Sequence, residues 1–396
     1  MLKNRHIHTL QWLLGGWLMM LLAACSSGSY PTDDEEAEQS VNNHKAVTLT
    51  VYVYSPEYTP STLRRISPRR ATTGEVSAIG RESTVYSLQL WIFESESGAH
   101  VGYLNTTDLA GLNTGDGTYY KIPVSDDFAE RKPNVDVFVM ANVTPATCGI
   151  GELDSETTRE ELLANAKIID HSEDKTYYFG LSNLTKSVPE GAGLPMAGKL
   201  TVQPVVGDAP TLRVGTMDEV ANVQLTRAVS KLRFVFAKTT GEPTVNITSI
   251  TMHSDMIPEE EYLFRTPLSI TYNDSEEELL SSPISDVAET ANPFEYIYLN
   301  QDAQEYENLI SQANLTVEGP IYLRETDKQL SGTISYKIDN GDLQTADFAM
   351  QAAGDFRRNH TWIVYAYYAG NGRLQLSTLY VKDWSEKETN HAVYNW

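Results

Sequence analysis

The chain has 396 residues, which is long for one ordinary domain and suits two β-rich domains or one large sandwich. Apolar residues make up 41% and charged residues 21%, so the composition provides for a sizeable core and argues against general disorder. With 30 basic and 53 acidic residues the formal net charge is −23, and such a chain repels phosphate backbones. Two cysteines exclude a disulfide framework and a cysteine-based zinc site.

The first residues have the features of a secretory signal. Lys3 and Arg5 precede an apolar stretch at 10–22 that is too short to span a bilayer comfortably. Leu-Ala-Ala then stands directly before Cys25, and this arrangement resembles a bacterial lipobox. The resemblance implies a signal peptide at 1–24 and lipidation of Cys25 as the first mature residue. The alternative is a plain signal peptide in which the cysteine is incidental.

Residues 25–45 form a predicted flexible acidic tether. They are polar and carry an acidic run from Asp33 to Glu36, so they offer nothing to pack. Ser26 follows the cysteine where an aspartate is associated with inner-membrane retention in well-studied lipoproteins. We therefore expect the protein at the cell outer membrane, exposed at the surface.

The remaining chain is dominated by alternating strand patterns. In the first half they occur at 47–54, 88–92, 135–139 and 199–205, with one helix predicted from a capping box at Thr157 and Glu160. Leu162, Leu163, Ala166 and Ile169 are predicted to share one face of that helix. A second series follows at 231–236, 245–252, 294–299, 332–338, 361–368 and 374–381, and residues 273–278 are predicted to be a loop.

Frequent short strands with little helix predict antiparallel β-sandwiches. The expected fold is mostly β, with two tandem sandwich domains at 46–226 and 227–396. One or two short helices are expected in the N-terminal domain. The boundary is placed near 223–228.

Motifs for catalysis are absent from the sequence. There is no G-x-S-x-G, H-E-x-x-H, P-loop or G-x-G-x-x-G after a strand, and no histidine pair has metal-ligand spacing. The acidic runs Glu259–Glu261 and Glu276–Glu278 could supply acid–base or calcium groups, but their polar setting favours a solvated face. The lone thiol of Cys148 is predicted to be inert packing. We therefore expect no enzyme, no cofactor and no metal site.

Four stretches together resemble the fimbrillin family, whose members are lipoprotein-derived pilins with two transthyretin-like β-sandwich domains. They are TVYSLQLWIFESESGAHVGYL at 84–104, VDVFVMANVT at 135–144, LPMAGKLTV at 194–202 continuing to 223–236, and FRRNHTWIVYAYY at 356–368 with VKDW at 381–384 and Trp396. Each stretch is weak alone. Their order and spacing over nearly the whole mature chain carry the resemblance.

The resemblance implies assembly by strand exchange after an Arg-specific protease cuts the loop behind the first strand. The matching loop here is 55–83, which is basic in an otherwise acidic chain. The predicted cut lies between Arg70 and Ala71, and the alternatives are Arg64, Arg65 and Arg69. The strand that would be removed carries Val47, Leu49, Val51 and Val53. The other interpretation is a basic loop that is merely flexible.

The C-terminal segment 373–396 is the candidate donor strand, with alternating apolar residues at Leu374, Leu376, Leu379 and Val381. It could equally be the last strand of its own domain. The implied partners are other fimbrial subunits, outer-membrane lipid through Cys25, the protease, and host or bacterial surface ligands, but no nucleic acid. A stalk, anchor or tip role is left open.

Two other classes remain as alternatives. The first is a surface lipoprotein that binds glycans, for which Trp91, Tyr365, Tyr367 and Tyr368 are candidate aromatic contacts, although they sit inside strand patterns. The second is a β-sandwich hydrolase that uses acidic residues.

Overall fold

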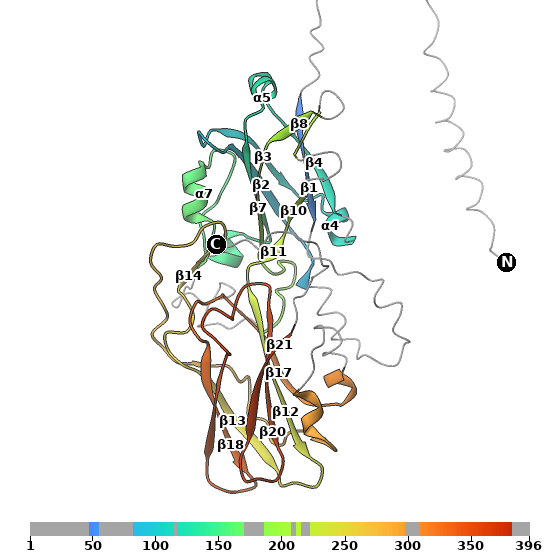
Figure 1. The fold of residues 1–396 in the computed structure, drawn as a ribbon, viewed down its shortest axis with the longest axis vertical. Coiled ribbons are helices and arrows are strands. Elements are labelled where there is room, and N and C mark those ends of the chain that lie inside the picture. Colours follow the sequence, from blue (N-terminus) through green and yellow to red (C-terminus); the bar gives the residue numbers. More distant parts are fainter. Residues whose placement is uncertain are drawn as a thin grey trace, which may run out of the picture. The chain divides into compact units, whose positions relative to one another are not determined.

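The chain divides into two units, 1–45 and 46–396, and the computed structural model describes only residues of the second. The described residues are 47–54, 82–114, 117–169, 186–206, 211–214, 222–297 and 309–381. They form a mostly β protein of several sheets in which most strand pairs are antiparallel, which confirms the predicted fold class (Figure 1).

Two five-stranded sheets come from the first half of the chain. One has the order β10-β1-β9-β8, with β4 paired to β1, and the other has the order β11-β7-β5-β2-β3. The strands of the first sheet are β1 (Thr48–Tyr54), β4 (Thr118–Pro123), β8 (Pro204–Val206), β9 (Thr211–Val214) and β10 (Asn222–Gln224). Those of the second are β2 (Leu88–Glu94), β3 (His100–Thr106), β5 (Val135–Ala141), β7 (Met196–Val202) and β11 (Thr226–Arg227).

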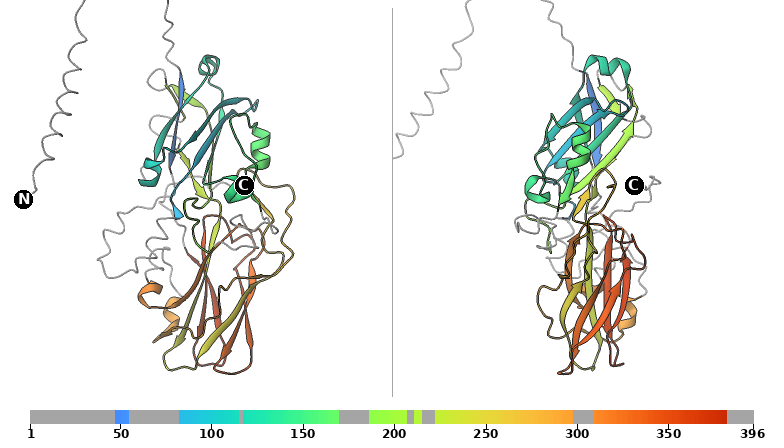
Figure 2. Two further views of the ribbon diagram at one scale, coloured as in Figure 1. Left: turned by 180° about the vertical axis from the view of Figure 1, so that it is seen from behind. Right: turned by 90° about the vertical axis from the view of Figure 1, so that its left-hand side faces the viewer.

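Two further sheets come from the second half, and Figure 2 shows their long strands, coloured from yellow to red, running beside one another. The first sheet contains β12 (Ser230–Thr239), β16 (Glu289–Thr290), β17 (Thr316–Leu323), β20 (Thr361–Tyr368) and β21 (Gln375–Val381). The second contains β13 (Val245–Met252), β15 (Glu277–Glu278), β18 (Ser331–Ile338) and β19 (Gln344–Ala349). A two-stranded ladder joins β6 (Lys167–Ile169) to β14 (Glu260–Tyr262).

The strand patterns of the first half have their expected buried faces. The apolar residues of β1 pack with alternate residues of β2 and β5 in one core, including Leu88, Leu90, Val137 and Val139. The opposite faces of β2 and β5 are buried too, because Trp91 and Phe138 belong to a second cluster. Strands covered on both faces read as continuous apolar runs, as VDVFVMA does here.

The second half has its own core. Residues of β12, β13, β18 and β20 meet there, among them Phe234, Ile250, Ile334 and Val364, all of which are fully buried. The outer face of β12 and β20 is covered as well, because Tyr365 packs with Tyr296 and Ile310. The bounds 46–226 and 227–396 stay a prediction for where one domain ends and the next begins.

Helices are short and more numerous than expected in the first half. Its described residues contain α4 (Ala110–Thr114), α5 (Asp126–Arg131), α6 (Pro145–Cys148) and α7 (Arg159–Asn165), where one or two were predicted. The capping box of α7 is formed by Thr158 and Glu161, one residue later than predicted at Thr157 and Glu160. Of the predicted apolar face, Leu162 is buried, and Ile169 lies in β6 instead. Helices of four to seven residues are too short to show a helical period in sequence.

Two other predictions in the second half need correction. Residues 294–299 were expected to form a strand, but η2 (Pro293–Tyr296) is a 3₁₀ helix, and 298–299 lie outside the described residues. Asn292 caps it by accepting a hydrogen bond from the amide of Phe294, and a proline at the first position favours a helical start. The predicted loop 273–278 contains the two-residue strand β15.

Candidate strand-exchange site

Strand β1 has partners on both of its edges. It pairs antiparallel with β4 from Thr48 to Val53, parallel with β9 at its start, and parallel with β10 at its end. Beyond the ladder, the carbonyl of Val47 accepts from Val124 N–H at 3.0 Å, and that of Tyr54 accepts from Leu225 N–H at 2.9 Å. The first strand of the chain is therefore an interior strand of its sheet.

Three side chains of β1 reach the core. Leu49, Val51 and Val53 are each 0% exposed, and Val47 is half-buried beside them. Thr50 is buried on the other face, where its Oγ1 has no hydrogen-bond partner among the described residues. This is the face alternation that the sequence predicts for a removable strand, so loss of β1 would leave an apolar groove flanked by two unpaired strand edges.

The outer face of β1 packs against its neighbour β4. The rings of Tyr52 and Tyr119 lie 4.5 Å apart, and these two residues oppose each other in the strand register. Tyr119 is 60% exposed, so the pair is accessible from solvent. Gly117 faces the ring of Tyr52, and a Cβ at that glycine would lie 2.3 Å from the tyrosine hydroxyl. The contact therefore depends on glycine at position 117.

The predicted modification and processing residues lie outside the described residues. These are Cys25, Arg64, Arg65, Arg69, Arg70 and Ala71. The described chain leaves the site at Tyr54 and resumes at Glu82, so the predicted cut falls between these two points. A cut there would separate β1 from the rest of the chain.

A buried polar cluster holds the chain where it resumes. We call it the Glu82 cluster, and it consists of Glu82, Lys231, Arg227 and Tyr322, all with 2% exposure or less. The Glu82 carboxylate is 3.0 Å from Lys231 Nζ and accepts the hydroxyl hydrogen bond of Tyr322. Arg227 Nε donates to the Glu82 carbonyl at 2.9 Å. Sequence reasoning missed this cluster, although a basic residue on each side of the apolar run of β12 was a signal for it.

Arg227 adds contacts on both sides of the Glu82 cluster. It donates to Ser83 Oγ at 2.6 Å and to Asn359 Oδ1 at 3.1 Å. Burial lowers the pKa of Arg227 to about 10, and the Glu82 carboxylate opposes that shift. The cluster therefore fixes residues 82–83 to segments 140 and more residues away, independently of β1.

The candidate donor segment is paired within its own sheet in this structure. β21 runs antiparallel to β20, from Thr361 opposite Val381 to Tyr367 opposite Gln375. Leu374 is buried, and Leu376 packs against the core of the second half. Leu379 also lies in β21, as does Val381, while 382–396 lie outside the described residues.

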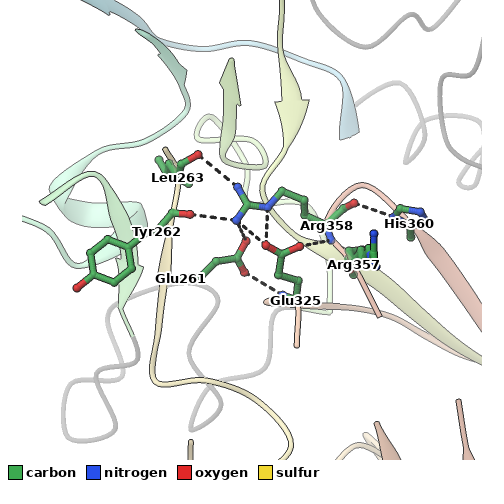
Figure 3. A network of polar contacts seen from close by, with 8 residues as sticks. Glu261, Tyr262, Leu263, Glu325, Arg357, Arg358 and His360 are labelled. Atoms are coloured by element: carbon green, nitrogen blue, oxygen red, sulfur yellow. Dashed lines mark hydrogen bonds and ion pairs between the residues drawn. The ribbon is translucent and has the colours of Figure 1, made fainter. Parts of the chain in front are cut away.

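The acidic run at Glu259–Glu261 is not the solvated face that was predicted. Glu261 is 4% exposed and lies in a network with Arg358 and Glu325 (Figure 3). Arg358 NH2 is 3.0 Å from Glu261 and 2.6 Å from Glu325, and it donates to the Tyr262 carbonyl at 3.0 Å. Burial, which outweighs the nearby guanidinium, raises the pKa of Glu261 to about 8. The alternation of β14 turns this one carboxylate inward.

Other singled-out residues prove to be core. Cys148 is fully buried, and burial raises the pKa of its thiol to about 12, which fits inert packing. Trp91 is 0% exposed, and the aromatic residues of β20 are also buried, so they form no exposed platform for glycans; these are Tyr365, Tyr367 and Tyr368. Among the described residues no cluster of His, Cys, Asp or Glu could hold a metal, and no helix is long and apolar enough to cross a membrane.

No family model matches the chain, and no curated protein matches it. Solved structures do align with it. A proposed cell adhesion protein from Parabacteroides distasonis shares 13% identity, with 85% of this chain and 97% of that one covered, at a TM-score of 0.48. A proposed cell adhesion protein from Bacteroides eggerthii shares 11% identity, with 85% of this chain and 95% of that one covered, at a TM-score of 0.46.

The tip fimbrial protein Mfa3 from Porphyromonas gingivalis, with a C-terminal truncation, shares 13% identity over 85% of this chain and 99% of that chain, at a TM-score of 0.46. All three TM-scores lie below 0.5 and the identities are low.

Proposed function

We propose that the chain is a structural subunit of cell-surface fimbriae that supports adhesion. It is exported as a lipoprotein precursor, carries lipid on Cys25 and resides at the outer membrane before it enters the fimbrium. An Arg-specific protease cuts it between Arg70 and Ala71, and assembly follows by strand exchange. The proposal draws on the fimbrillin resemblance of the sequence. It includes no catalytic step and no cofactor.

The position of β1 is the single observation that carries the proposal. A strand at the edge of a sheet could leave without opening the core, whereas β1 lies between β4 on one edge and β9 and β10 on the other. Its loss would expose two strand edges and one groove, which is the template that an incoming strand needs. The Glu82 cluster would hold the chain after the cut in place while β1 leaves.

The driving force follows from burial. Each of Leu49, Val51 and Val53 contributes about 1.5–3 kcal/mol by being buried. Each ladder hydrogen bond adds a net of about 0.5–1.5 kcal/mol. A subunit that has lost β1 therefore gains substantially by accepting a donor strand. Segment 373–396 of another subunit is the candidate donor.

An anchor or tip subunit is the second candidate. In the structure β1 is fully paired and its core side chains are completely buried, which is the state that a subunit retaining its first strand would keep. Such a subunit would receive other subunits without losing β1. Cleavage at the loop separates the two candidates.

The experiment treats the purified full chain with an Arg-specific endoprotease. Products are analysed by N-terminal sequencing and by size on a non-boiled gel. The matched control replaces Arg64, Arg65, Arg69 and Arg70 with glutamine. We expect a new terminus at Ala71 and a ladder of detergent-resistant oligomers, neither of which forms with the control.

Two results would contradict the stalk role. A chain that resists cutting in the loop would keep β1, and a chain that is cut but stays monomeric would lack exchange. Either outcome leaves the anchor or tip candidate.

A further inference from the structure

A cavity lies in the second half of the chain, remote in sequence from β1. It has a volume of about 480 Å³ and is lined by residues from 258–272, 325–327 and 354–358. Small-ligand pockets commonly measure roughly 300–1,000 Å³, so the volume fits a small molecule better than a folded partner. Part of its wall is the network around Arg358 (Figure 3).

The carboxylates that line the cavity are all partnered inside the protein. Glu260 pairs with Lys167 at 2.7 Å, and Asp327 accepts the hydroxyl hydrogen bond of Tyr272. Arg358 pairs with Glu325, and Glu261, which lies 3.0 Å from the same guanidinium, has a pKa that burial raises to about 8. These groups therefore have little capacity left for a cationic ligand.

Two arginines at the cavity have unused donors. Arg265 lies 4.2 Å from the ring centre of Tyr262, and Arg357 Nε donates to the Gly354 carbonyl at 2.8 Å. Both are exposed, and neither forms an ion pair with any residue that the structure describes. Burial opposes ionisation of Glu260, but Arg265 is close enough to help lower the pKa of that carboxyl, so Arg357 is the less compensated of the two. Together the two guanidiniums offer an anion donors in one hollow of a protein whose net charge is −23.

The rest of the wall is apolar or aromatic. The rings of Tyr262 and Tyr272 are covered by cations, Arg265 and Lys167 over the first and Lys328 over the second. The apolar surfaces of the cavity are those of Pro258, Pro267 and Ile270. Such surfaces pack against the C–H faces of a sugar ring, while planar guanidiniums bind a carboxylate in a bidentate manner. Both kinds of contact are needed by a sugar that carries a carboxylate.

We propose that this cavity binds a carboxylated saccharide of the uronic acid type. Arg265 and Arg357 hold the carboxylate, and the proline and isoleucine surfaces contact the ring. The site is formed by the second half alone and does not depend on exchange of β1. It would give a cell-surface subunit its own ligand.

Calorimetry with the full chain tests the site. The probes are trigalacturonate, the neutral trisaccharide maltotriose, and a triglutamate peptide of similar charge. The variants are Arg265→Gln and Arg357→Gln, and the matched control is Arg373→Gln, an exposed arginine in the turn before β21. Losing a hydrogen bond between a charged side chain and the ligand weakens the affinity about tenfold or more.

We expect trigalacturonate to bind and maltotriose to bind at least tenfold more weakly. Each cavity variant should weaken the acidic sugar about tenfold, and the control should change it less than twofold. Absence of binding, or binding unaffected by either variant, would overturn the site. Equal or tighter binding of triglutamate would overturn its assignment to a saccharide.

Discussion

At the scale of single residues, Lys231 is a charge buried within the Glu82 cluster. It is 0% exposed, and its Nζ is 3.0 Å from a carboxylate that is itself buried. Removing one member of a buried pair costs about 3–5 kcal/mol when the other is left uncompensated, and Arg227 beside Glu82 offsets part of that cost. Lys231→Met should therefore lower the free energy of unfolding by up to that amount, measured with urea.

Two controls distinguish loss of the Lys231–Glu82 ion pair from loss of side-chain packing. Adding Glu82→Gln to Lys231→Met should recover part of the loss, because the unpaired charge is then gone. Arg131→Met removes an exposed arginine paired with Glu94 and should change stability little. Equal losses for Lys231→Met and Arg131→Met would contradict the importance of burial.

Glu261 should give the protein a pH-dependent stability. Its pKa is about 8 in the folded state and near 4.5 when unfolded, so the folded state keeps a proton that the unfolded state releases. The free energy of unfolding should therefore fall as pH rises from about 4.5 to 8, and level off above that. The change attributable to Glu261 is on the order of 2 kcal/mol or more.

Urea unfolding between pH 5 and 9 measures this dependence. The variant Glu261→Gln cannot titrate, so its stability should fall less with pH than that of the unchanged protein. The comparison uses the difference between the two slopes, because every other group contributes to both. Parallel slopes would show that Glu261 is already ionised at pH 5.

At the scale of elements, the sequence predicted strands well where one face is apolar. The alternation of β1 and that of β5 were both recognised, and their ends were correct within a residue or two, but burial of β5 on both faces was not predicted. Residues 294–299 failed because an aromatic-rich segment was taken for a strand despite proline at position 293. Propensity alone could not reveal that Asn292 starts a 3₁₀ turn there.

A chain that begins at residue 71, the predicted new terminus, tests β1 as an element. Without β1 it should bury less apolar surface and unfold at a lower temperature than the full chain. A synthetic peptide of residues 46–55 should restore the unfolding temperature by occupying the groove. The same peptide with Val51→Asp should fail, because a charge would enter the core. An identical effect of both peptides would contradict groove binding.

At the scale of the whole molecule, the mostly β architecture followed from composition and periodicity. The contacts between distant segments did not, because they depend on which buried charges meet. Glu82 bonds to Tyr322 across 240 positions, and no local pattern encodes that pairing. The same limit hid the cavity, whose Arg265 and Arg357 are 92 positions apart (357 − 265). It also left the inward turn of Glu261 unpredicted.

Locking β1 in place is the most direct test of strand exchange. Tyr52 and Tyr119 oppose each other in the antiparallel register, where Cα atoms lie about 4.5–5.5 Å apart, a distance that a disulfide spans. The variant Tyr52→Cys with Tyr119→Cys is oxidised, cut with the Arg-specific protease, and compared with the same sample under reductant. The account predicts detergent-resistant oligomers only after reduction. Equal oligomer formation in both samples would contradict departure of β1 as the assembly step.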